Sequence, residues 1–152
     1  MQDKITLINY PLDMPYLKDL AERKRSEADL HYDNRYTKIF NQYTSVKIND
    51  PYVIQVMKDF EVNAKPKIYY QAPNYYLPMH TDNGTQCSIN FIISDDAAPI
   101  IFEEGEFFYK QCLLNTQVKH SVLNLNKERI LLKFSIFDKT YNDVLKTLKF
   151  RV

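Results

Sequence analysis

Cysteine is scarce in this sequence, in which Cys87 and Cys112 are the only two among 152 residues. Two cysteines are too few for the disulfide framework of a small secreted protein, and we expect both to be buried free thiols. Neither has a second cysteine at CxxC spacing, which excludes a zinc ribbon. The scarcity of cysteine therefore directs the search for a functional site to other side chains.

Several other features are also missing. No apolar run approaches the ~20 residues of a membrane span. The 20 basic and 19 acidic residues nearly balance, so the basic excess of a nucleic-acid-binding protein is absent. The first four residues carry charges where a signal peptide has an apolar core, and we expect a cytoplasmic location. There are no internal repeats and no Gly/Ser linker.

The length and the composition, 45% hydrophobic and 26% charged, predict one globular domain over 1–152. We expect its residues 1–65 to be mainly helical, 66–138 to form a β core, and 139–152 to include a short terminal helix at 141–149. Asp13 precedes apolar residues at helical spacing, and Asp50-Pro51 is a second helix start. Residues 32–46 are ambiguous, and we interpret them as a loop and a short strand.

The second half of the chain contains about eight short runs rich in β-branched and aromatic residues. These runs are 67–71, 75–80, 86–94, 99–103, 106–110, 112–116, 120–125 and 129–138. Both glycines of the protein lie between such runs, in the turn dipeptides Asn83-Gly84 and Glu104-Gly105. Short strands joined by tight turns predict a mainly β protein with a double-sheet jelly roll, packed on the N-terminal helices.

Four polar residues form the candidate site: His80, Asp82, His120 and Arg129. Side chains alternate along a strand, so His80 and Asp82 point to the same side. Two imidazoles and one carboxylate can cap one face of an octahedral metal and leave the opposite face open, as in non-haem Fe(II) oxygenases. Arg129 adds a planar cation that suits the far carboxylate of a five-carbon diacid.

The last strand alternates between an apolar and a mixed face. Ile130, Leu132, Phe134 and Ile136 form the apolar face, and Arg129, Leu131, Lys133 and Ser135 form the mixed face. We expect the apolar face to pack on the N-terminal helices and the mixed face to line a pocket. The same alternation makes Ser88 and Asn90 candidate pocket residues and places Tyr76 on the side of His80. We further expect strands 120–125 and 129–138 to be hairpin neighbours.

Four segments together resemble the iron(II)/2-oxoglutarate-dependent oxygenases, and most closely their prolyl- and aspartyl/asparaginyl-hydroxylase-like branches. These segments are Leu77-Pro-Met-His-Thr-Asp82, Cys87-Ser-Ile-Asn-Phe91, His120-Ser-Val122 and Arg129-Ile-Leu131. The resemblance covers roughly residues 67–138 and implies a double-stranded β-helix core. The chain is short, with few of the insertions that cover the substrate in that family.

This resemblance also implies roles for individual residues. His80, Asp82 and His120 are then the Fe(II) ligands, and Arg129 holds the distal carboxylate of 2-oxoglutarate. A tyrosine from the preceding strand, Tyr70 or Tyr69, completes the co-substrate site. The implied reaction uses O2, decarboxylates 2-oxoglutarate to succinate and hydroxylates a C–H bond of an amino-acid side chain, free or in a peptide. The hard chemistry belongs to the iron, while the protein supplies geometry.

Two alternatives remain open on the sequence alone. One is a cupin-like metal-binding protein that uses no oxoacid, although such sites usually carry more histidines than this chain offers. The other is a non-catalytic binding module with the same fold. Asp82 before Asn-Gly is also an ordinary turn residue, and the third histidine, His31, has no partner residues and is interpreted as a surface or capping residue.

Overall fold

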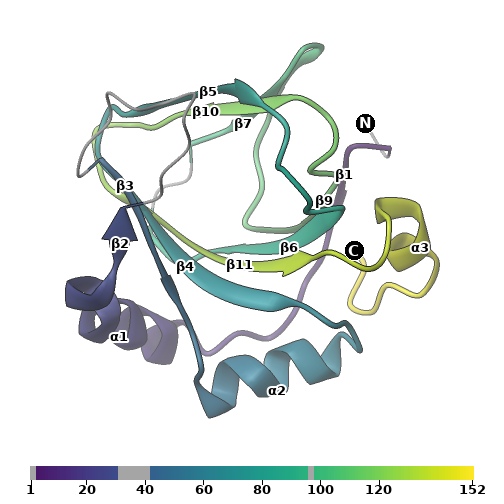
Figure 1. Cartoon of the computed structure of the whole chain (residues 1–152), viewed down its shortest axis with the longest axis horizontal. Helices are drawn as coiled ribbons and strands as arrows, with labels where there is room; N and C mark the ends of the chain where they lie inside the picture. Colours follow the sequence, from purple (N-terminus) through teal and green to yellow (C-terminus); the bar gives the residue numbers. More distant parts are fainter. Residues whose placement is uncertain (1–2, 31–41, 96–97) are drawn as a thin grey trace.

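Two antiparallel sheets face each other in the computed structural model, which describes residues 3–30, 42–95 and 98–152 (Figure 1). The larger sheet has the order β1 (Ile5–Leu7), β9 (Gln111–Leu114), β6 (Cys87–Ile92), β11 (Arg129–Ile136), β4 (Lys65–Gln71), β3 (Tyr43–Lys47) and β2 (Asp29–Leu30). The smaller sheet has the order β5 (Tyr76–His80), β10 (His120–Leu123), β7 (Ile100–Phe102) and β8 (Gly105–Phe107). The predicted jelly-roll fold is confirmed.

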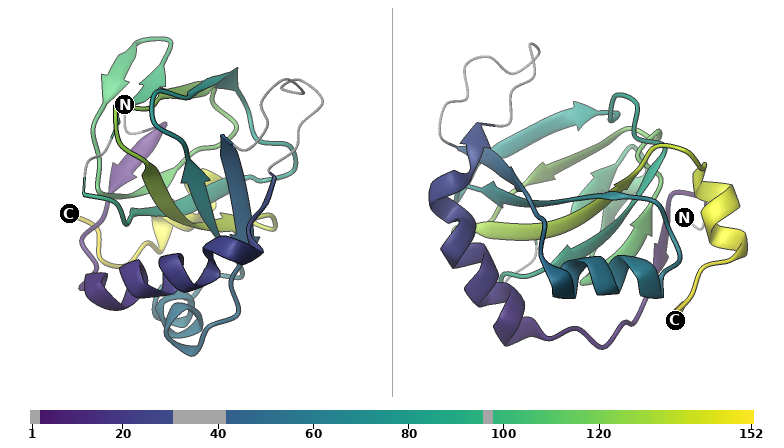
Figure 2. Two further views of the ribbon diagram at one scale, coloured as in Figure 1. Left: turned by 90° about the vertical axis from the view of Figure 1, so that its left-hand side faces the viewer. Right: turned by 60° about the horizontal axis from the view of Figure 1, so that its bottom comes forward.

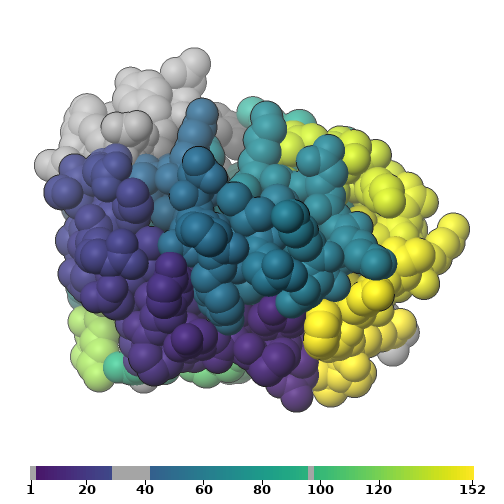
Figure 3. Space-filling view, turned by 90° about the horizontal axis from the view of Figure 1, so that it is seen from below, coloured from purple at the N-terminus to yellow at the C-terminus, as the bar shows by residue number. Residues whose placement is uncertain are grey.

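Two helices cover the outer face of the larger sheet (Figures 2 and 3). They are α1 (Met14–Lys24), which continues into the 3-10 turn η1 (Arg25–Glu27), and α2 (Pro51–Asp59). Both begin as the sequence predicts: Asp13 accepts a hydrogen bond from the backbone N–H of Tyr16, and Asp50 accepts from those of Tyr52 and Val53. These caps fix where each helix starts, so their apolar sides meet the sheet.

The C-terminal helix α3 (Tyr141–Lys146) begins with a capping box between Thr140 and Asp143. It is shorter than the predicted helix, which extended to residue 149. The N-terminal segment also contains more strand than predicted, because β1 and β2 join the larger sheet. The ambiguous stretch 32–46 ends in β3, while its part up to residue 41, like His31, lies outside the described residues.

The alternation of β11 organises the interior, as expected. Leu132, Phe134 and Ile136 belong to the core cluster that includes residues of α1 and α2. Arg129, Leu131, Lys133 and Ser135 face the opposite way and line a cavity between the sheets. Cys87 and Cys112 are buried free thiols, which confirms that prediction. Within the described ranges, no helix has the length and apolar character needed to cross a membrane.

Phe134 is 1% exposed and makes an edge-on ring contact with Phe91. We expect Phe134→Ala to lower the free energy of unfolding by about 3–5 kcal/mol, because it leaves a cavity in the helix-facing core. Urea denaturation followed by circular dichroism measures this loss. Phe108→Ala is the matched control, since Phe108 is 65% exposed and its removal should cost less than about 0.5 kcal/mol. Equal losses in the two variants would contradict the placement of the core.

One topological expectation is wrong. Strands β10 and β11 are not hairpin neighbours, because β10 pairs with β5 and β7 while β11 lies between β4 and β6 in the other sheet. Residues 124–128 therefore carry the chain from one sheet to the other. The side-chain amide of Asn124 holds this crossing by donating to the carbonyl oxygens of Gln71, Ala72 and Lys127.

Candidate metal centre

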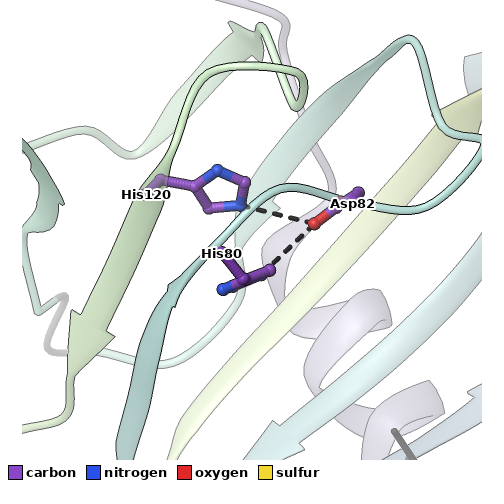
Figure 4. A group of neighbouring side chains, drawn as sticks. All are labelled: His80, Asp82 and His120. Atoms are coloured by element: carbon purple, nitrogen blue, oxygen red, sulfur yellow. Dashed lines mark ion pairs between the residues drawn. The ribbon is translucent and has the colours of Figure 1, made fainter. Parts of the chain in front are cut away.

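His80, Asp82 and His120 come together at one end of the smaller sheet (Figure 4). His80 ends β5 and His120 begins β10, and the two residues are paired directly across the strands. One oxygen of Asp82, Oδ1, lies 3.3 Å from Nε2 of His80 and 3.4 Å from Nε2 of His120. The strand pairing thus brings the two imidazoles together, and the turn after β5 places the carboxylate of Asp82 beside them.

Each imidazole is oriented by a backbone carbonyl. Nδ1 of His80 lies 2.6 Å from the oxygen of Pro78, and Nδ1 of His120 lies 2.7 Å from that of Val118. A carbonyl only accepts, so Nδ1 carries the proton, and Nε2 of the neutral ring then presents a lone pair. Both lone pairs face the carboxylate of Asp82. Three acceptors that converge in this way fit a shared divalent metal ion, with backbone carbonyls that fix the ligand tautomers.

The second oxygen of Asp82, Oδ2, forms an ion pair of 2.5 Å with Nζ of Lys133. Burial favours the neutral acid, but the charge of Lys133 outweighs it and holds the pKa of Asp82 far below its usual range. Lys133 is 13% exposed, and its ammonium also lies 5.6 Å from the centre of the Tyr69 ring. Asp82 is therefore ionised, with one oxygen facing the imidazoles and the other held in place.

A β-bulge positions His80. Between the pairs His80–His120 and Leu77–Val122, β5 contains one residue more than β10. The extra residue shifts the alternation, so Leu77 lines the cavity, whereas Tyr76 points outward and is 48% exposed. The expectation that Tyr76 shares the side of His80 is therefore wrong, because strict alternation does not hold across a bulge.

A cavity of about 480 Å³ extends from the three ligands between the two sheets. Arg129 lies at its buried end and is 5% exposed. Its Nη2 donates to the hydroxyl of Tyr109 at 3.0 Å, while Nη1 is 3.5 Å from Oε1 of Gln71. Within the described residues, its Nε has no hydrogen-bond partner and no carboxylate contacts the guanidinium. A buried guanidinium without an acidic partner is unfavourable, so this end of the cavity favours the binding of an anionic ligand.

Tyr109 adds a hydroxyl group to the end of the cavity that contains Arg129. Its hydroxyl accepts from Arg129 and, at 3.3 Å, from the side-chain amide of Asn90. Because both neighbours donate, the hydroxyl proton of Tyr109 is directed to neither of them. Burial raises the pKa of Tyr109, so the phenol keeps that proton and can donate it to a ligand beside Arg129.

The other residues predicted for the site lie partly inside and partly outside the cavity. Asn90 lines the cavity, and the Ser88 hydroxyl donates to the Asn90 side chain without lining the cavity itself. Tyr70 lies on the opposite face of β4, where its hydroxyl donates to the carbonyl of Ala21 in α1. This placement contradicts a co-substrate role for Tyr70. Its neighbour Tyr69, the other tyrosine offered, lines the cavity instead.

The sequence placed Lys133 on the pocket-lining face of the last strand but did not predict its ion pair with Asp82, and it did not identify Tyr109. Lys133 had a usable signal, because a lysine on the mixed face of a buried strand needs an acidic partner. Tyr109 had none, since it lies in the loop after β8 and reaches Arg129 only through the fold.

Comparison with known proteins places the fold. The structure is similar to a Pseudomonas putida prolyl-4-hydroxylase, with a TM-score of 0.65, 11% identity, and coverage of 89% of this chain and 92% of that chain. It is also similar to the viral collagen prolyl hydroxylase of Paramecium Bursaria Chlorella virus-1, with a TM-score of 0.61, 9% identity, and coverage of 87% and 94%. A Burkholderia pseudomallei oxidoreductase of the 2OG-Fe(II) oxygenase family gives a TM-score of 0.54, 12% identity, and coverage of 84% and 82%.

No protein-family model matches the sequence, and no curated protein is detectably similar to it. At identities of 9–12%, the structural likeness shows the fold and not the activity. The chain is thus a double-stranded β-helix protein whose His-Asp-His group has the composition of a metal site. Its function has to be argued from the site itself.

Proposed function

We propose that this protein is an Fe(II)/2-oxoglutarate-dependent oxygenase that hydroxylates a C–H bond of an amino-acid side chain, free or in a peptide. The observation that carries the proposal is one cavity with two features. It has a His80-Asp82-His120 acceptor group on one side and, at its buried end, the guanidinium of Arg129 with no acidic partner among the described residues. A metal site alone does not require the second feature.

The chain's own residues explain how such a reaction would be organised. His80, Asp82 and His120 would hold Fe(II), which supplies the oxygen chemistry when bound, and three protein ligands leave room for exogenous ones. Arg129 offers a planar donor pair, and Tyr109 a hydroxyl, for the far carboxylate of 2-oxoglutarate. The apolar walls formed by Leu77, Leu131 and other cavity residues limit the access of water.

The spacing along β11 agrees with these roles. Arg129 and Lys133 are four residues apart on one strand, which corresponds to about 13 Å between their backbones. Lys133 contacts Asp82 at the metal group, while Arg129 reaches into the cavity from the buried end. The intervening space suits a five-carbon diacid that binds a metal at one end and a guanidinium at the other.

An anaerobic spectrum tests the proposal. We expect Fe(II) and 2-oxoglutarate together, but neither alone, to produce a weak visible charge-transfer band, which His80→Ala abolishes. Arg129→Gln should still give the band, at higher 2-oxoglutarate concentrations. If wild-type protein binds Fe(II) but gives no band at any 2-oxoglutarate concentration, the oxygenase proposal is wrong, and a metal-binding protein that uses no oxoacid becomes the better description.

A further inference from the structure

Three lysines form a row across the inner face of the larger sheet. Lys133 of β11 is paired directly with Lys67 of β4, and Lys67 is paired directly with Lys47 of β3. All three line the cavity that contains the metal ligands, and so does Lys65, two residues before Lys67 on the same strand. We call Lys47, Lys65 and Lys67 the lysine rim.

This arrangement is unfavourable without an anion. Like charges that are directly opposite on neighbouring strands destabilise a sheet. Burial, and then the charges of Lys47, Lys133 and Lys65, lower the pKa of Lys67. The ion pair with Asp82 neutralises Lys133. Among residues 3–30, 42–95 and 98–152, however, no acidic side chain forms an ion pair with a member of the lysine rim. Among the described residues that line the cavity, Asp82 is the one carboxylate, against five cationic side chains.

The lysine rim lies farther along the sheet than Arg129: Lys67 and Lys47 are level with Lys133, and Lys65 lies one cross-strand pair beyond. Along β11, Arg129 is at one end of the cavity, Lys133 marks the position of Asp82, and Ser135, the partner of Lys65, lies beyond it. Exposure follows the same order: Arg129 is buried, Lys67 is half-buried, and Lys47 and Lys65 are exposed. A diacid held by Arg129 would therefore leave the lysine rim available for a second ligand that enters from the open side.

We propose that the lysine rim binds the anionic groups of the substrate, which is an acidic amino acid or peptide that carries a phosphate or neighbouring carboxylates. That this molecule is the substrate rests on the proposed function, whereas the binding of an anion at the lysine rim does not. Lysines are compact cations that suit multiply charged anions, in contrast to the planar fork of Arg129. Because neighbouring strands are about 4.8 Å apart, Lys67 and Lys47 can contact the same anionic group.

Calorimetric titration of the full chain tests this site, with pyrophosphate and with tricarballylate as probes of the two chemistries. At about 10 mM ionic strength, where the Debye length is about 30 Å, we expect one anion to bind per chain. Lys67→Gln and Lys47→Gln should each weaken binding roughly tenfold, because each removes a charge-assisted contact. Lys58→Gln is the matched control, since Lys58 is exposed on α2, which packs on the opposite face of the sheet. Its affinity should stay within about twofold of the wild type.

Saturating 2-oxoglutarate separates the two anion sites. If the rim is distinct from the Arg129 end, 2-oxoglutarate leaves probe binding intact. The proposal is overturned if neither probe binds the wild type. It is also overturned if Lys67→Gln and Lys47→Gln bind the probes as tightly as Lys58→Gln does. A third contradicting result is that 2-oxoglutarate displaces both probes and only Arg129→Gln abolishes their binding. If the probes bind and their binding depends on Lys67 and Lys47, but Fe(II) and 2-oxoglutarate give no charge-transfer band, the anion site is upheld and the oxygenase function is refuted. Preference for pyrophosphate or for tricarballylate identifies the chemistry that the rim selects.

Discussion

His120→Ala is expected to lower the affinity for Fe(II) by at least about 100-fold. This estimate is a lower bound, because changes to groups that merely orient metal ligands already cost 10- to 100-fold. His120 is 5% exposed and its ring is fixed by the carbonyl of Val118, so no other described side chain can replace its Nε2. Anaerobic competition with a chromophoric chelator measures the affinity. Turnover of 2-oxoglutarate should fall by about 1,000-fold in the same variant.

Lys58→Ala provides the control for this experiment. It should leave both the affinity for Fe(II) and the turnover within about twofold of the wild type, because Lys58 is exposed on α2, which packs on the opposite face of the larger sheet. Circular dichroism of both variants separates loss of metal from loss of fold. A folded His120→Ala protein with wild-type Fe(II) affinity would remove His120 from the ligand set and place the metal elsewhere.

The features that depend on local patterns were predictable from the sequence. The caps at Asp13 and Asp50 and the two faces of β11 follow from side-chain chemistry and strand periodicity, and the structure contains all of them. Both turn dipeptides are also present, with Gly84 at φ 77° and Gly105 at φ 141°. The grouping of His80, Asp82 and His120 was predictable as well, because the motif and the strand order restrict where a third ligand can come from.

The expectations that failed depend on how strands are distributed between two sheets. Residues adjacent in sequence were assumed to be adjacent in the sheet, yet the segment at Asn124 crosses from β10 to β11 between sheets. Tyr76 was placed by strict alternation, which the bulge in β5 interrupts. For Tyr70, the family resemblance left two neighbours open, and only the position of α1 decides that Tyr70 bonds to Ala21 while Tyr69 faces the cavity.

Arg129→Gln is expected to raise the 2-oxoglutarate concentration needed for half-maximal turnover by roughly 30- to 1,000-fold. Removing one member of a buried, hydrogen-bonded charge pair typically costs about 2–4 kcal/mol, which corresponds to this range. Because the guanidinium would contact the carboxylate that does not react, the maximal rate should fall much less than the affinity. Steady-state assays of succinate formation at varied 2-oxoglutarate, with Fe(II) saturating, measure the two effects separately.

Tyr109→Phe is the companion variant, because it removes one hydroxyl from the same end of the cavity and keeps the ring. Its 2-oxoglutarate requirement should rise by roughly 10-fold, the cost of a single lost hydrogen bond to a charged group. Arg129→Lys should lie between the wild type and Arg129→Gln, since it keeps the charge but loses the planar fork. If all three variants keep the wild-type requirement, 2-oxoglutarate does not bind at this end. The buried charge of Arg129 would then be structural, and urea denaturation should show Arg129→Gln to be the least stable of the three, because the hydroxyl of Tyr109 and the side chain of Gln71 lose their buried partner.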